Sequence, residues 1–131
     1  MTYLNRSLEK KFLEVNQDYS CIMLIGPRQV GKSTMLEHLM EGTTRRKVSL
    51  DDLSERQLAQ KDPALFLELH PAPVLIDEVQ YAKNIFNEIK VIVDNDNKNG
   101  NIWITGSQNY TIMKNVTESL AGRIGIMNLF S

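Results

Sequence analysis

At residues 26–33 the chain reads Gly26-Pro27-Arg28-Gln29-Val30-Gly31-Lys32-Ser33. This stretch matches the phosphate-binding pattern G-x-x-x-x-G-K-[ST] at every required position. An apolar run at residues 21–25 precedes it and a helical pattern at residues 34–40 follows it, so the order is strand, loop, helix. Glycines let backbone N–H groups close around phosphate oxygens, and the start of the next helix offers unpaired N–H groups and a positive dipole end. The stretch therefore predicts a nucleotide site.

The residues of this loop have distinct expected roles. Lys32 is expected to reach the β- and γ-phosphates, and the hydroxyl of Ser33 is expected to ligate Mg²⁺. The predicted nucleotide-binding residues are the loop and the first residue after it, namely Gly26, Pro27, Arg28, Gln29, Val30, Gly31, Lys32, Ser33 and Thr34.

A second chemical landmark lies at residues 74–78, Val-Leu-Ile-Asp-Glu. Its apolar residues do not alternate with polar ones, which is typical of a parallel strand buried on both faces. The run ends in two acids. We expect Asp77 to hold the Mg²⁺ shell and Glu78 to polarise a water for attack on the γ-phosphate.

The alternation of apolar runs and helical patterns predicts the fold class. Strands are expected at residues 21–25, 47–50, 74–78, 101–105 and 124–129, with helices at 3–17, 34–40, 54–69 and 84–95. The helical pattern at 54–69 is interrupted at Asp62-Pro63, where Asp62 can cap a second helical piece. This order predicts an α/β domain with a mainly parallel sheet covered by helices on both faces, and a ligand at the carboxyl ends of the strands.

Polar residues follow two of the other strands. Asp51 and Asp52 come after the second strand, where the two carboxylates are candidates to face the nucleotide side; the favoured alternative is that Asp52 or Ser54 caps the next helix. After the fourth strand, a polar side chain is expected between the Asp-Glu pair and the γ-phosphate. Ser107 is the preferred candidate and Thr105 or Gln108 the alternatives; a helix N-cap is the structural explanation for this residue.

Composition sets limits on function. The chain has 131 residues, 42% hydrophobic and 24% charged, with a net charge of −1, as expected for one globular domain. This charge argues against a broad nucleic-acid-binding face, and the cluster at residues 45–47 is read as a solvated strand entry. No apolar run is long enough to span a membrane, and the N-terminus lacks a signal-peptide pattern. Cys21 is a lone cysteine in an apolar strand. We expect a cytoplasmic protein.

Taken together, the motifs resemble a known family. They are residues 26–33, Ser-Leu-Asp-Asp at 49–52, Asp-Pro at 62–63, Ile-Asp-Glu-Val-Gln at 76–80, Thr-Gly-Ser at 105–107 and Ser-Leu-Ala-Gly-Arg at 119–123. The chain is similar over its whole length to the AAA-type ATPase family of bacteria and archaea numbered fourteen. The resemblance implies a P-loop NTPase α/β/α sandwich of AAA+ type with sheet order 5-1-4-3-2. It also implies ATP and Mg²⁺ as ligands.

The resemblance also assigns residue roles. It implies Glu78 as the catalytic glutamate and Ser107 as the sensor residue. Arg123 corresponds to the family's terminal arginine and is expected to act as an arginine finger, in this chain's own site or in that of a neighbouring subunit of a homo-oligomer. The alternative is a surface arginine that caps a carbonyl.

One departure from the family concerns length. Members continue beyond the fifth strand into a helical region and a C-terminal domain, whereas this chain stops at Ser131. We therefore expect residues 1–131 to be a single AAA+ core, with an N-terminal helix at 3–17, that is a fragment of such a protein.

Several functions fit these features. An ATP-hydrolysing module is favoured, coupled to an unknown partner or to the absent region. A GTPase is disfavoured, because Asn97-Lys98-Asn99-Gly100 lacks the Asp of the guanine-reading N-K-x-D, and a small-molecule kinase is disfavoured by Glu78 beside Asp77. The alternatives are a nucleotide-gated switch with negligible turnover, and an ATPase linked to nucleic acid through the missing region.

Overall fold

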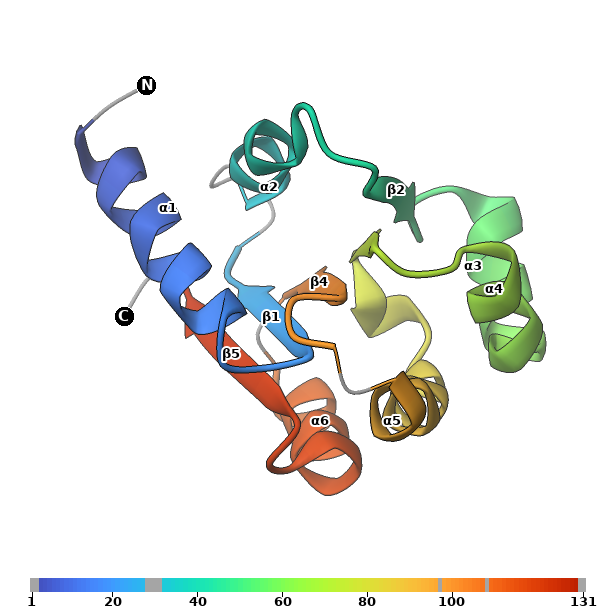
Figure 1. Ribbon diagram of the computed structural model, residues 1–131. Coiled ribbons are helices and arrows are strands. Elements are labelled where there is room, and N and C mark those ends of the chain that lie inside the picture. Colours follow the sequence, from blue (N-terminus) through green and yellow to red (C-terminus); the bar gives the residue numbers. More distant parts are fainter. Residues whose placement is uncertain (1–2, 28–31, 97, 108, 130–131) are drawn as a thin grey trace.

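The computed structural model describes residues 3–27, 32–96, 98–107 and 109–129 (Figure 1). Helices and strands alternate along it, as the sequence predicts. The elements in chain order are α1 (Tyr3–Asn16), β1 (Cys21–Ile25), α2 (Lys32–Met40), β2 (Arg46–Ser49), α3 (Leu53–Lys61), α4 (Pro63–Leu69), β3 (Val74–Asp77), the 3₁₀ turn η1 (Val79–Tyr81), α5 (Ile85–Asp96), β4 (Ile102–Gly106), α6 (Tyr110–Leu120) and β5 (Ile124–Asn128).

The strands form one five-stranded sheet in the order β2-β3-β4-β1-β5. Every pairing in it is parallel. This is the expected order 5-1-4-3-2 read from the opposite edge, so the predicted topology is confirmed. Because the strands are parallel, the residues that follow β1, β2, β3 and β4 all lie at the same end of the sheet, where the strands have their carboxyl ends.

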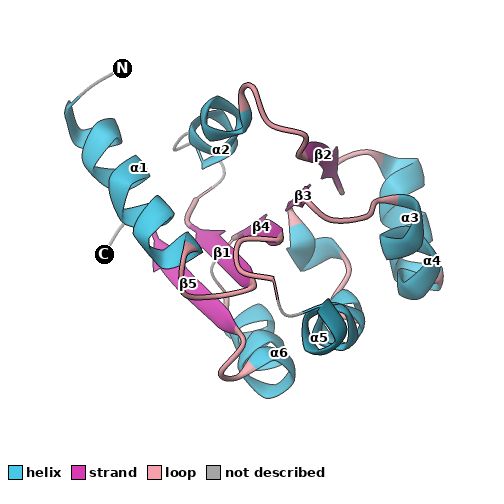
Figure 2. Ribbon diagram, in the orientation of Figure 1, coloured by secondary structure: helices cyan, strands magenta, loops and turns pink. Residues whose placement is uncertain are grey.

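Helices cover both faces of the sheet (Figures 1 and 2). Along β1 the side chains of Cys21, Met23 and Ile25 pack into a core with residues of α3, α4, α5 and α6. The alternate residues Ile22 and Leu24 pack into a second core with α1 and α2. The alternation follows from the period-2 geometry of a strand, and it confirms the three-layer sandwich.

Short polar side chains set the helix boundaries. Asp52 accepts hydrogen bonds from the N–H groups of Ser54 and Glu55, so the favoured capping role is confirmed. Asp62 accepts from the N–H of Leu65 and starts α4, as the sequence predicted. Pro63 then occupies the first helical position, where the missing N–H leaves no donor unsatisfied.

An arginine stabilises the amino ends of two strands, at the end of the sheet opposite the phosphate-binding loop. Arg45 belongs to the cluster at 45–47 that was read as a solvated strand entry, but its side chain is partly buried and its guanidinium bonds to the backbone. It donates to the carbonyls of Val74 and Asn101, each at 3.0 Å, and to that of Gly100. It also lies 3.9 Å from the centre of the Trp103 ring. Burial lowers the pKa of Arg45 to about 10, which leaves it charged at neutral pH.

We expect Arg45→Met to lower the free energy of unfolding by about 2–3 kcal/mol. The change leaves buried carbonyl groups without a charged donor and removes the cation–π contact. Urea denaturation measures the loss. The exposed neighbour Arg46, changed to Met in the same way, is the control and should alter stability by less than about 0.5 kcal/mol. Equal effects of the two changes would contradict the structural role of Arg45.

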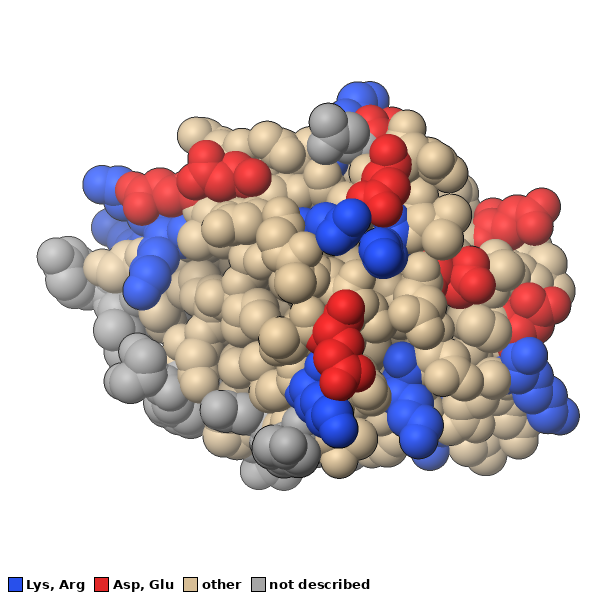
Figure 3. Space-filling view, turned by 90° about the horizontal axis from the view of Figure 1, so that it is seen from below, with Lys and Arg blue, Asp and Glu red and all other residues tan. Residues whose placement is uncertain are grey.

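The surface shows no extended region of one charge sign on the face drawn in Figure 3. There, Lys and Arg side chains are interspersed with Asp and Glu. No helix in the described ranges combines the length and the apolar character that a bilayer crossing requires.

Candidate nucleotide site

Lys32 lies at the entrance of the phosphate-binding loop. It is the first residue of α2 and its side chain is only 2% exposed. Its Nζ donates to the carbonyl oxygens of Gly26, at 2.6 Å, and Pro27, at 3.0 Å. The ammonium group is thus directed to the position where the sequence expects phosphate oxygens.

The middle of the loop lies outside the described residues. The roles of Arg28, Gln29, Val30 and Gly31 therefore stay predictions. Thr34 is described and exposed, one turn into α2.

The structure brings together the two residues predicted to hold the metal. The hydroxyl of Ser33 donates to Asp77 Oδ1 at 2.8 Å, although the residues are 44 positions apart in the chain. Ser33 follows β1 and Asp77 ends β3, and only β4 separates these strands in the sheet. The contact is therefore a direct consequence of the strand order.

Other hydroxyl groups complete the surroundings of Asp77. Thr105, at the end of β4, is fully buried and donates to Asp77 Oδ1. Ser49, at the end of β2, donates to Asp77 Oδ2 at 3.5 Å. The carboxylate is thus held from α2, β2 and β4. Sequence reasoning quoted Ser49 in the run at 49–52 without giving it a role, although its place at the carboxyl end of a parallel strand is the signal for one.

Glu78 has an unusual backbone conformation. Its φ of 63° and ψ of 49° lie in the left-handed region, which costs a residue with a side chain about 1–2 kcal/mol. Thr105 holds this conformation, because its Oγ1 accepts a hydrogen bond from the N–H of Glu78 at 3.0 Å. The carboxylate of Glu78 accepts from Gln80 Nε2 at 2.6 Å. Backbone and side chain are thus both restrained in a residue that is only 5% exposed.

The oxygens at this edge of the sheet fit a hard divalent cation. Carboxylate oxygens of Asp51, Asp77 and Glu78 lie within 4.8 Å of one another, and the Ser33 hydroxyl contacts Asp77. An all-oxygen set of carboxylates and a hydroxyl is what Mg²⁺ prefers. Asp51, one of the acids that the sequence placed on the nucleotide side or at a cap, thus lies on the nucleotide side.

The comparison with known proteins agrees with this geometry. The family model described as "AAA domain", numbered fourteen, matches residues 18–131. The chain belongs to this AAA domain family. The predicted membership is therefore confirmed, and with it a nucleotide-binding ATPase module at the level of the family.

Two curated relatives share part of this AAA domain. They are the uncharacterized protein Rv2008c of Mycobacterium tuberculosis and the uncharacterized protein Mb2031c of Mycobacterium bovis. Each is 31% identical over 111 residues, which cover 82% of this chain and 24% of the relative. The matched region thus spans about a quarter of the length of these relatives.

The chain around the end of β4 carries Ser107, the preferred sensor candidate, and Thr105, one of its alternatives. Thr105, the alternative candidate, makes the contacts with Asp77 and Glu78. Ser107 donates its backbone N–H to Gln80 Oε1 at 3.2 Å. Thr105 therefore lies beside the acids, and the choice of Ser107 as the polar residue between the acids and the γ-phosphate stays a prediction. Gln108 lies outside the described residues.

The structure does not bring Arg123 to the phosphate-binding loop of its own chain. Arg123 directly precedes β5, whose first residue, Ile124, pairs with Cys21 at the start of β1. β1 has five residues and rises about 3.3 Å per residue. Arg123 therefore lies roughly 16 Å from the loop, at the opposite end of the sheet. It donates to Asp94 at 2.6 Å and to the carbonyl of Ala121 at 3.1 Å. Arg123 thus does not reach the loop of its own chain in this structure, and its arginine-finger role stays a prediction.

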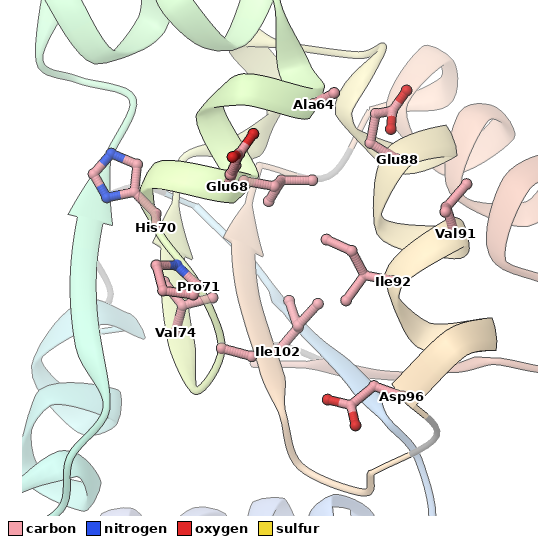
Figure 4. Close-up of a pocket in the computed structure, with 12 residues that line it drawn as sticks. Ala64, Glu68, His70, Pro71, Val74, Glu88, Val91, Ile92, Asp96 and Ile102 are labelled. Atoms are coloured by element: carbon pink, nitrogen blue, oxygen red, sulfur yellow. The ribbon is translucent and has the colours of Figure 1, made fainter.

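A cavity of about 480 Å³ lies between α4 and α5, away from the loop (Figure 4). Val74 and Ile102, the first residues of β3 and β4, line it, so it opens at the amino ends of the strands. Among the described residues that line it, the acids Glu68, Glu88 and Asp96 are present and Lys and Arg are absent. This charge repels phosphate, and the cavity is therefore not the nucleotide site.

We expect Thr105→Val to destabilise the AAA domain by about 1–3 kcal/mol. Valine has nearly the same shape, but it leaves the Glu78 N–H without its acceptor and removes a donor to Asp77, both in a buried position. Thermal or urea denaturation measures the loss. Thr105→Ser keeps the hydroxyl and should retain most of the wild-type stability. A Ser variant that is as unstable as the Val variant would contradict the hydrogen-bonding role.

Proposed function

We propose that this AAA domain binds ATP with Mg²⁺ and hydrolyses it by attack of water on the γ-phosphate. The observation that supports this most directly is the contact between Ser33 and Asp77, next to Glu78. Side chains from separate elements converge there at the carboxyl ends of the strands, and the Lys32 ammonium contacts the carbonyls at the start of the phosphate-binding loop. This is the arrangement that phosphoryl transfer requires, in which most of the catalysis is positioning and charge stabilisation.

The residues divide the work as follows. Ser33 and Asp77 would hold Mg²⁺, which when bound neutralises charge on the β- and γ-phosphate oxygens. Lys32 exchanges its carbonyl partners for phosphate oxygens and stabilises the charge that develops on them. Glu78 orients a water molecule and accepts its proton. Thr105 holds the carboxylate of Asp77 and the backbone of Glu78 in position.

The proposal includes a shared site in a homo-oligomer. Arg123 is roughly one-third exposed at the edge of the sheet, and its partner Asp94 is exposed too. A neighbouring copy that presents this arginine to the phosphate-binding loop would supply the cation that stabilises the γ-phosphate in the transition state.

Phosphate release from Mg-ATP, measured per chain over a range of protein concentrations, tests the proposal. We expect Mg²⁺-dependent release that EDTA abolishes, with a specific activity that rises with protein concentration because a neighbouring copy completes the site. A constant specific activity would contradict the shared site while leaving hydrolysis in place. Release no greater than that of Lys32→Ala, in a chain that still binds Mg-ATP, would contradict hydrolysis and favour a nucleotide-gated switch.

A further inference from the structure

We propose that Gln80 is a positioning residue for Glu78, which it links to the backbone after β4. The inference rests on the proposed hydrolysis. Sequence reasoning quoted Gln80 in the run at 76–80 without giving it a role. In the structure its side-chain amide lies between two parts of the site: Nε2 donates to Glu78 Oε2 at 2.6 Å, and Oε1 accepts from the N–H of Ser107 at 3.2 Å.

The partners fix the orientation of this amide. A backbone N–H only donates, so the amide atom facing Ser107 must be the oxygen. The amide nitrogen must then face the carboxylate of Glu78, which as an anion only accepts. The two hydrogen bonds agree on one orientation, and the opposite orientation would lose both. The bridge is therefore specific for a carboxamide of this length.

The neighbouring residues leave room for the bridge and hold it. A Cβ atom at Gly106 would lie 3.2 Å from Gln80 Oε1 and 3.1 Å from Met23 Cε, so a side chain there would crowd the amide. On the other side, the carbonyl of Tyr81 accepts from Gln60 Nε2 at 2.7 Å. The guanidinium of Arg56 lies 3.7 Å from the centre of the Tyr81 ring. The turn η1 is thus attached to α3, which fixes the backbone of Gln80.

Glu78 needs such a partner because its backbone determines only where its side chain begins. Thr105 holds the N–H of Glu78, but the flexible side chain beyond Cβ places the carboxylate. A misplacement of about 1 Å at a catalytic group is enough to cost about a hundredfold in rate. Gln80 restrains that carboxylate by linking it through two hydrogen bonds to the backbone of Ser107, the residue predicted to sense the γ-phosphate.

The central test compares kcat and nucleotide affinity in Gln80→Met. Methionine keeps the length of the side chain and removes both hydrogen bonds. We expect kcat for Mg-ATP to fall about 10–100-fold while the Kd for ATP changes less than about twofold. Gln80→Glu keeps the acceptor for Ser107 but places a second carboxylate beside Glu78, so its kcat should fall at least as far. The control is Gln57→Met, an exposed glutamine on α3, which should leave kcat within about twofold.

A double-mutant cycle separates positioning from general damage. If Gln80 acts through Glu78, the Gln80→Met change should cause no further loss of turnover in a Glu78→Gln background. A further loss in that background, an unchanged or raised kcat in Gln80→Met alone, or a parallel loss of ATP affinity would each overturn the proposal.

A measurement without turnover keeps the bridge testable if the proposed function fails. That failure would be evident first, as a wild-type chain that turns over no faster than Glu78→Gln. In ¹⁵N-labelled protein, Glu78→Ala should then shift the NMR signals of the Gln80 side-chain amide and of the Ser107 backbone amide. Signals at the wild-type positions would overturn the bridge itself, whether or not the chain hydrolyses ATP.

Discussion

Lys32→Ala is expected to weaken the binding of Mg-ATP at least about 30-fold. The ammonium group is buried at the entrance of the loop and directed to it by Gly26 and Pro27. Removing it takes away a charge-assisted hydrogen bond to phosphate in a site shielded from water, where loss of one partner of such a pair costs about 2–5 kcal/mol. Calorimetric titration with Mg-ATP measures the change.

The matched control for this change is Lys47→Ala. Lys47 is exposed and pairs on the surface with Glu37 at 2.9 Å, so its removal should leave the ATP affinity within about twofold. Thermal denaturation of Lys32→Ala should show a folded domain, which separates loss of binding from loss of structure. A folded Lys32→Ala chain that binds Mg-ATP within about threefold of the wild type would contradict the assignment of the loop.

Glu78→Gln is expected to lower kcat at least about 100- to 1000-fold and to leave the affinity for Mg-ATP within about threefold. The amide has the size of the carboxylate but cannot take a proton from water, and general-base catalysis contributes about 10²–10⁴ to such reactions. Phosphate release under saturating Mg-ATP measures kcat, and equilibrium titration measures affinity.

Glu118→Gln is the control for Glu78→Gln. Glu118 is an exposed glutamate on α6, remote from the sheet edge that holds Asp77, and its change should leave both quantities unaltered. Retention of more than about a tenth of the wild-type kcat by Glu78→Gln would mean that another group activates the water. A nucleotide-gated switch would instead show little turnover in either chain.

Much of the fold follows from the sequence because its physical causes are local. The apolar runs, the caps Asp52 and Asp62 and the loop at 26–33 each determine a short piece of structure. The strand order, by contrast, depends on pairings between distant segments, and only the resemblance to the family supplied it. The contact between Ser33 and Asp77 depends on that order, so the topology explains why these two residues meet, and their role as metal ligands stays a prediction.

The features that the sequence could not show have physical reasons as well. Arg45 lies in a run of basic residues, and only the fold shows that its guanidinium reaches the carbonyls at the amino ends of β3 and β4. Thr105 and Ser107 are two residues apart, a spacing that would put both on one face of a strand, so the spacing alone does not tell which of them contacts the acids; β4 ends at Gly106, and Ser107 lies beyond it. Arg123 directly precedes β5, so its distance from the loop of its own chain depends on the pairing of β5 with β1, which no local pattern shows.

Titration with ATP in the presence and absence of Mg²⁺ tests the central claim most directly, namely that Ser33 and Asp77 form a metal-dependent nucleotide site. Calorimetry on the wild type and on Asp77→Asn gives the required comparison. We expect one ATP per chain, bound at least about tenfold more tightly with Mg²⁺ in the wild type, and little effect of Mg²⁺ in Asp77→Asn. ATP binding that is the same in both chains, with and without Mg²⁺, would contradict the account.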